Sequence, residues 1–211
     1  MSVRKGEEWG VEGVVPDGLE IATSDADLQR ILTRILDRTS TRRDDDRPTV
    51  GLVGGDLWRT VGGTPGRSGL VAGATAALLT IDLGLVTVGD RDVPFAGHLI
   101  ARRSWWRGEV LAVMNAQFLG GWDVAPRSHP NDGRLDVLRV RPTMSIGDRW
   151  KARARLPSGT HVPHPLVEQS RVAQLDVRFA RPLDVVVDGV PLGRYDRLAV
   201  AVLPDALTIV I

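Results

Sequence analysis

The segment from Asn115 to Val137 combines polar residues and glycines in a pattern that could hold an ion. Asp132 offers a carboxylate, and backbone carbonyls of the same loop could complete the oxygen ligand set that a hard cation requires. The alternative is that Asn131-Asp132-Gly133 forms only a tight turn, because turns favour these residue types. On physical grounds alone the turn is the favoured interpretation, and the cation site is the alternative.

The segment from Arg102 to Arg107, which reads RRSWWR, mixes cations and indole rings. Tryptophan favours membrane–water boundaries and arginine attracts anionic lipid, so an interfacial role is one interpretation. The favoured one is a strand end whose tryptophans pack in the core or beneath an arginine. A basic cluster later in the chain could attract lipid phosphate, or it could be a solvated helix face, which is the commoner case. Its members are Arg139, Arg141, Arg149, Lys151, Arg153 and Arg155.

Composition excludes several classes of function. The chain has 211 residues, with 43% hydrophobic and 25% charged, which suits one globular domain or one domain plus a fragment. A net charge of +1 gives no global attraction to nucleic acid, and no nucleic-acid partner is expected. The absence of cysteine excludes disulfides, thiolate zinc sites and cysteine nucleophiles. Without an apolar leader or an 18-residue apolar run, we expect a cytoplasmic protein, or one held peripherally at the membrane.

The N-terminal third predicts one helix and one strand. Ser24–Arg38 has an N-cap serine, an aspartate three residues later and apolar residues at helical spacing. The polar stretch Thr39–Pro48 predicts an exposed linker. Thr49–Val53 then predicts a short buried strand, which the glycines Gly54 and Gly55 close.

From Ile81 onward the sequence predicts β-structure. Short runs rich in Val, Leu and Ile recur between turn residues, a spacing typical of a sandwich or barrel. Asp188-Gly189 predicts a hairpin turn. Ser145 with Asp148 begins one helix, which continues to Leu156 and is ended by Gly159. The predicted strands are Ile81–Val88, Phe95–Arg102, Glu109–Asn115, Arg134–Val140, Val172–Phe179, Leu183–Val187, Arg197–Leu203 and Ala206–Ile211.

The Asn115–Val137 segment resembles the signature of the diacylglycerol and sphingosine kinase-like lipid kinases. It shares the order Asn, Gly-Gly, Ala-Pro and Asp-Gly-x-Leu-Asp. The resemblance implies a structural magnesium ion bound by the side chain of Asp132 and the main-chain carbonyls of His129 and Arg134.

Further matches follow in the same order along the chain. Gly159-Thr160-His161, Pro182–Gly189 and Leu203–Leu207 are similar to later segments of that family. The resemblance implies a β-rich α+β fold, with a C-terminal antiparallel β-sandwich of the lipid-kinase type over residues 81–211. Residues 1–80 would form a reduced α/β segment like a nucleotide-binding unit. The chain looks like a compact, diverged member of the actinobacterial type.

The strand before Asp56 is similar to the family's nucleotide-binding GGDGT motif. By resemblance, Gly54, Gly55 and Asp56 would meet the phosphates of ATP, with Asp56 at the catalytic centre. The motif then departs, because Leu57 replaces its next glycine and Trp58 its threonine. Leu57 is expected to tolerate a positive φ poorly and to narrow the approach to a phosphate. Thr60 would have to replace the lost hydroxyl.

The second departure falls in the family's DGE turn, whose glutamate is the expected base. Here that position is Val190, which accepts no proton, and loss of a general base typically lowers a rate about 10²–10⁴-fold. Asp188 is close in sequence, but its side chain is expected to face the turn. These departures favour a diverged, non-catalytic relative that binds a lipid, nucleotide or protein partner. The alternative is an active ATP-dependent lipid kinase. An open sheet edge suggests a homodimer.

Overall fold

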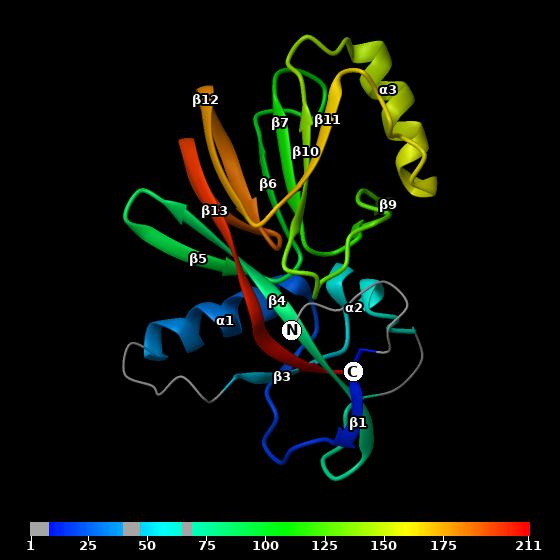
Figure 1. Ribbon diagram of the computed structural model, residues 1–211, viewed down its shortest axis with the longest axis vertical. Coiled ribbons are helices and arrows are strands. Elements are labelled where there is room, and N and C mark those ends of the chain that lie inside the picture. The colour runs from blue at the N-terminus through cyan, green and yellow to red at the C-terminus, as the bar shows by residue number, and fades with distance from the viewer. Residues whose placement is uncertain (1–8, 40–46, 65–68) are drawn as a thin grey trace.

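The computed structural model describes residues 9–39, 47–64 and 69–211 (Figure 1). Most of the chain is strand, with three α-helices among the described residues, as a β-rich α+β fold requires. The helices are α1 (Asp25–Thr39), α2 (Asp56–Thr60) and α3 (Ile146–Arg155), followed by the 3-10 turn η1 (Leu156–Ser158). The strands are β1 (Val11–Val14), β2 (Ile21–Ala22), β3 (Thr49–Leu52), β4 (Thr75–Val88), β5 (Arg91–Phe95), β6 (His98–Arg102), β7 (Val110–Met114), β8 (Phe118–Leu119), β9 (Trp122–Asp123), β10 (Leu135–Val140), β11 (Val167–Val172), β12 (Gln174–Val187) and β13 (Val190–Val210).

One large sheet runs through the whole molecule. Its main path is β1-β4-β13-β12-β6-β7-β10-β11, with β5 on β4 and with β3 and β2 in parallel on the end of β13. Figure 1 shows β4 and β13 passing from the upper strands down to α1 and β3. β4 therefore continues through the boundary predicted at residue 80, and β13 borders both parts.

The main core lies between strands that face each other across the bent sheet. Val86 and Phe95 of β4 and β5 lie in one cluster with Leu99 of β6, Leu111 of β7 and Val185 of β12. This is the predicted C-terminal β-sandwich, and alternate residues of each strand fill it. β12 shifts register between Arg178 and Leu183 where the sheet changes direction.

A second core joins the N-terminal segment to the ends of the two long strands. Leu28 and Leu32 of α1 are buried there with Leu52 of β3, Ile81 of β4 and Ile209 of β13. Of the predicted apolar face of the first helix, Leu28, Ile31 and Leu32 therefore cover the lower part of the sheet, whereas Leu36 is exposed.

Several sequence predictions are confirmed. Ser24 Oγ accepts a hydrogen bond from the amide of Asp27, and Ser145 caps α3 by accepting one from Asp148. Asp188 and Gly189 have φ values of 47° and 83°, the pair that a type I′ hairpin requires. Most of the predicted linker Thr39–Pro48 lies outside the described residues.

Other predictions are wrong in detail. The pairs of runs predicted between Val172 and Val187 and between Arg197 and Ile211 are single strands, because register shifts let β12 and β13 continue. β11 was not predicted, because its central residues are polar and exposed at the sheet edge.

Leu28→Ala should lower the free energy of unfolding by about 2–5 kcal/mol, because the side chain is fully buried and its loss leaves a cavity. Leu36→Ala, at a 40% exposed position on the same helix, should cost much less. Urea unfolding of both variants measures the difference. Equal losses would contradict the packing of α1 on the sheet.

Candidate functional site

Asp25 occupies the amide groups at the start of α2. Its carboxylate accepts hydrogen bonds from the amides of Asp56 at 2.5 Å and Leu57 at 3.0 Å. A Cβ on Gly55, whose φ is 100°, would lie 2.7 Å from this carboxylate, and one on Gly54 would lie 2.4 Å from the carbonyl oxygen of Thr23. The two glycines are therefore required by contacts within the chain.

Asp56 and Thr60 hold the loop that leads to Gly120. Both carboxylate oxygens of Asp56 accept from the Gly120 amide, at 2.9 and 2.8 Å. The Thr60 hydroxyl donates to the Asp56 carbonyl oxygen and accepts from the amide of Gln117 at 3.0 Å. The residues predicted to meet a nucleotide thus connect α2 to the sandwich.

Leu57 causes none of the strain that the sequence suggested. Leu57 lies in α2 and is not among the described residues that have a positive φ. Its side chain is buried in the second core. Trp58 packs over Gly63, where a Cβ would lie 2.2 Å from the indole. The altered motif therefore forms a short helix whose apolar side chains stabilise the segment.

Asp188 does not face its own turn, which corrects the sequence prediction. Its side chain is buried, and its oxygens accept from the amides of Ala96 at 2.7 Å, Gly97 at 3.0 Å and His98 at 2.7 Å. The β12–β13 hairpin is thereby fastened to the link between β5 and β6. Val190 begins β13 and offers no group that exchanges a proton.

The two altered motif segments come together near Gly97, one through Asp188 and the other through Asp25, which binds the start of α2. A Cβ there would lie 3.0 Å from Asp188 Oδ1 and 3.6 Å from Asp25 Oδ1, so the two carboxylates flank one glycine. Beside them a groove of about 480 Å³ is lined by His98, Gly120 and Gly189. The fold therefore assembles the region where the resemblance places phosphoryl transfer, but its carboxylates bind backbone amides of the chain itself.

A second hollow, which we call the α3 pocket, lies between α3 and the outer face of β7 and β10. Val110 and Leu138 come from the large sheet, Ala152 from α3, Trp105 from the β6–β7 loop and Trp122 from β9. Its volume is about 110 Å³, of the same order as the engineered cavity of roughly 150 Å³ that admits benzene. The pocket therefore suits an apolar ligand or the end of one.

His161 is the unusual polar residue of the α3 pocket. It is 6% exposed, and neither ring nitrogen reaches hydrogen-bond geometry with a described residue, although Asp123 and the backbone of Val124 are near. Burial lowers the pKa of His161, with the Asp123 carboxylate acting in the opposite direction. The ring is therefore neutral at pH 7, with one donor and one acceptor nitrogen.

Arg149 fastens α3 to the loop that carries the tryptophans. Its guanidinium is buried and donates to the carbonyl oxygens of Met144, Trp105, Gly108 and Arg141. This residue is therefore no part of a solvated basic face.

The tryptophans of the RRSWWR segment pack as the favoured interpretation predicted. Arg102 lies 4.3 Å from the ring centre of Trp105, and Arg153 lies 5.4 Å from Trp106 and 5.2 Å from Trp122. Of these two stacked arginines, Arg153 lines the side of the α3 pocket.

Comparison with known proteins identifies the fold's relatives. Residues 89–211 match the model of the YegS C-terminal NAD kinase beta sandwich-like domain. The chain belongs to the YegS family of lipid-kinase-like proteins. It is 35% identical over 143 residues to proteins from two Pseudomonas aeruginosa strains, UCBPP-PA14 and PAO1, each named "Probable lipid kinase YegS-like". The match covers 66% of this chain, which spans 44% of the length of these relatives.

Solved structures agree with the assignment at the level of the fold. Two structures of Bacillus anthracis str. Sterne proteins whose names contain diacylglycerol kinase superpose with TM-scores of 0.65 and 0.67 at 12% identity. They cover 90% and 91% of this chain, which covers 76% and 77% of theirs.

The Asp132 loop of this YegS-family chain forms around a buried aspartate. Asp82 accepts hydrogen bonds from the amides of Gly133 at 2.7 Å and Asp205 at 2.9 Å. The carboxylate of Asp132 accepts from the amide of Arg134 and pairs with the guanidinium of Arg171. The His129 ring packs on Trp9, with ring centres 4.8 Å apart.

The donor chemistry of this loop fits the magnesium that the family resemblance implies. Asn131 Oδ1 and Asp136 Oδ2 are buried oxygens with no hydrogen-bond partner among the described residues. Oxygen ligands suit a hard cation. Arg171 competes for the Asp132 carboxylate, and the assignment of Asp132, His129 and Arg134 to magnesium stays a prediction.

Sequence reasoning missed Asp25, Asp82, Arg149 and the role of His161. Asp82 had a visible signal, because it is a lone charge inside an apolar strand. Asp25 had none, since its partners are backbone amides on another element. Arg149 was assigned to a basic surface, although its spacing from Ala152 and Leu156 places it on the inner side of α3.

Burial raises the pKa of Asp188 to about 6, against the effects of His98 and the amide donors. Burial also raises the pKa of Asp25, with the amides of Asp56 and Leu57 acting in the opposite direction. A carboxyl whose pKa is higher in the folded state binds more protons there. Its contribution to stability therefore falls as the pH rises from the unfolded to the folded pKa.

Asp188→Asn should remove this pH dependence. In the wild type the group should lower the free energy of unfolding by about 1.4 kcal/mol per pH unit between roughly pH 4 and pH 6. The difference in the free energy of unfolding between wild type and variant, measured with urea at several pH values, isolates the contribution of Asp188. Asp184→Asn, at an exposed position on the same strand, is the control and should retain the wild-type slope. An unchanged slope in Asp188→Asn would contradict the burial of this carboxyl.

Chelation tests the magnesium prediction. EDTA should lower the melting temperature of the wild type but not of Asp132→Ala, because only the wild type keeps the carboxylate ligand. Arg171→Gln should enlarge the response, since it removes the competing cation. Differential scanning fluorimetry measures all three proteins. The same response in wild type and Asp132→Ala would remove the site.

Proposed function

We propose that this YegS-family protein binds a lipid in the α3 pocket and does not transfer phosphate. The observation that carries the proposal is the pocket itself, an apolar space with Trp105 and Trp122 in its wall and a buried His161. A preformed apolar space with a few polar groups is the usual form of a small-molecule site.

The chemistry of the pocket indicates the kind of lipid. Arg149 has its donors bound to carbonyl oxygens and Arg153 lies over indole rings, so His161 is left to meet a polar atom of the ligand. A neutral imidazole pairs well with a hydroxyl or an ester oxygen. The nearby Asp123 disfavours a carboxylate in the same place. An acylglycerol fits these requirements.

Two features argue against kinase activity. The amides at the start of α2 bind Asp25, and a nucleotide phosphate would have to displace this carboxylate and would be repelled by its charge. The base position carries Val190, which transfers no proton. The residues present therefore do not fit ATP.

Dihexanoylglycerol, a short-chain lipid, tests the proposal. It should bind the wild type and change its tryptophan fluorescence, because indole rings line the pocket. Ala152→Phe should weaken binding by about tenfold or more, since a phenyl group takes the ligand's space. Ala154→Phe, on the exposed side of the same helix, is the matched control and should bind like the wild type.

Equal affinities of the two variants would contradict the location, and absence of wild-type binding would contradict the function. Calorimetric titration with Mg-ATP tests the alternative of an active lipid kinase. Micromolar binding together with phosphoryl transfer to the acylglycerol would replace the proposed function with that alternative.

A further inference from the structure

The outer side of α3 exposes two large apolar side chains. Trp150 is 65% exposed and Ile146 is 48% exposed. They lie four positions apart on a helix, so they are neighbours on its surface. A tryptophan this exposed lies far from its usual, mostly buried environment, and the pair leaves an apolar strip facing solvent.

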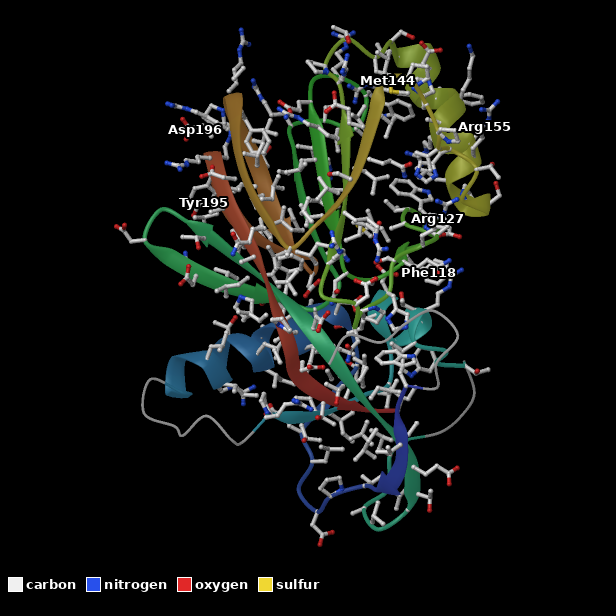
Figure 2. All side chains as sticks on the ribbon, in the orientation of Figure 1. Phe118, Arg127, Met144, Arg155, Tyr195 and Asp196 are labelled. Atoms are coloured by element: carbon white, nitrogen blue, oxygen red, sulfur yellow. The ribbon has the colours of Figure 1, made fainter. Side chains whose placement is uncertain are left out.

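Cations border this strip. Lys151 and Arg155 are exposed on α3, and Figure 2 places Arg155 at the outer rim of the molecule. Arg103 and Arg107 are exposed on the neighbouring loop. In the part of the chain that the structure describes, no carboxylate pairs with Arg103, Arg107 or Arg155. By contrast, ion pairs neutralise other cations nearby, namely Lys151 with Asp148, Arg139 with Glu109 and Arg141 with Glu168.

The helix and the loop form one surface because two arginines join them. Arg149 donates to the carbonyl oxygens of Trp105 and Gly108, and Arg153 stacks over Trp106. The apolar strip and the unpaired cations are therefore held together at one end of the molecule. Figure 1 shows α3 on the outside of the sheet at this end.

We propose that this surface docks on an anionic lipid bilayer. A helix with exposed tryptophan and isoleucine beside arginine and lysine suits the membrane interface, where indoles insert and cations meet lipid phosphates. With a net charge of only +1 for the chain, the cations at this end provide a local attraction. This proposal rests on the proposed function, because α3 also forms a wall of the pocket that would receive a lipid from the bilayer.

Co-sedimentation with vesicles tests the surface. The wild type should bind vesicles of phosphatidylglycerol and phosphatidylcholine and should bind pure phosphatidylcholine much more weakly. The double variant Ile146→Ser with Trp150→Ser should bind the anionic vesicles about tenfold less. Val71→Ser, at a 66% exposed position elsewhere, is the control and should bind like the wild type.

Charge is tested separately by Arg107→Gln with Arg155→Gln, which removes two of the unpaired cations and should weaken binding to the anionic vesicles by about tenfold. Absence of wild-type binding, or equal binding by the wild type and the Ile146/Trp150 double variant, would overturn the proposal. Dihexanoylglycerol separates the two proposals. The surface variants should bind dihexanoylglycerol with wild-type affinity, and Ala152→Phe should bind the anionic vesicles with wild-type affinity. Loss of both activities in one variant, with the circular dichroism unchanged, would overturn the assignment of separate surfaces.

Discussion

The structure depends on two buried carboxylates that satisfy backbone amides at the junction of its parts. Asp188 binds the link between β5 and β6, and Asp25 binds the start of α2. Buried amides without partners would each cost free energy, and charged acceptors make strong hydrogen bonds. Because both carboxylates flank Gly97, the N-terminal segment and the β-sandwich are fixed to each other at one point.

The same junction explains how the chain can retain a lipid-kinase fold while its motifs change. In this YegS-family protein Gly54, Gly55, Asp56 and Thr60 all have contacts within the chain. These contacts account for the residue types without any nucleotide. The altered positions also serve the fold, as Leu57 fills the core.

Much of the fold could be predicted from local signals, and the site could not. The helices α1 and α3 follow from a capping serine, an aspartate three residues later and helical spacing, and the hairpin follows from Asp188-Gly189. α2 is too short to show a period, and β11 lacks alternating apolar residues. The partners of Asp25 and Asp188 are backbone amides brought near only by the folded sheet, and no sequence pattern marks them.

β13 has a consequence for how the protein reaches its fold. This strand borders both cores, and Thr208 at its end pairs with Thr49 of β3. Contacts between residues so far apart in sequence close large loops and slow folding. The N-terminal core therefore cannot be completed until β13 has been synthesised. Because one continuous strand borders both cores, we expect them to form and to unfold together.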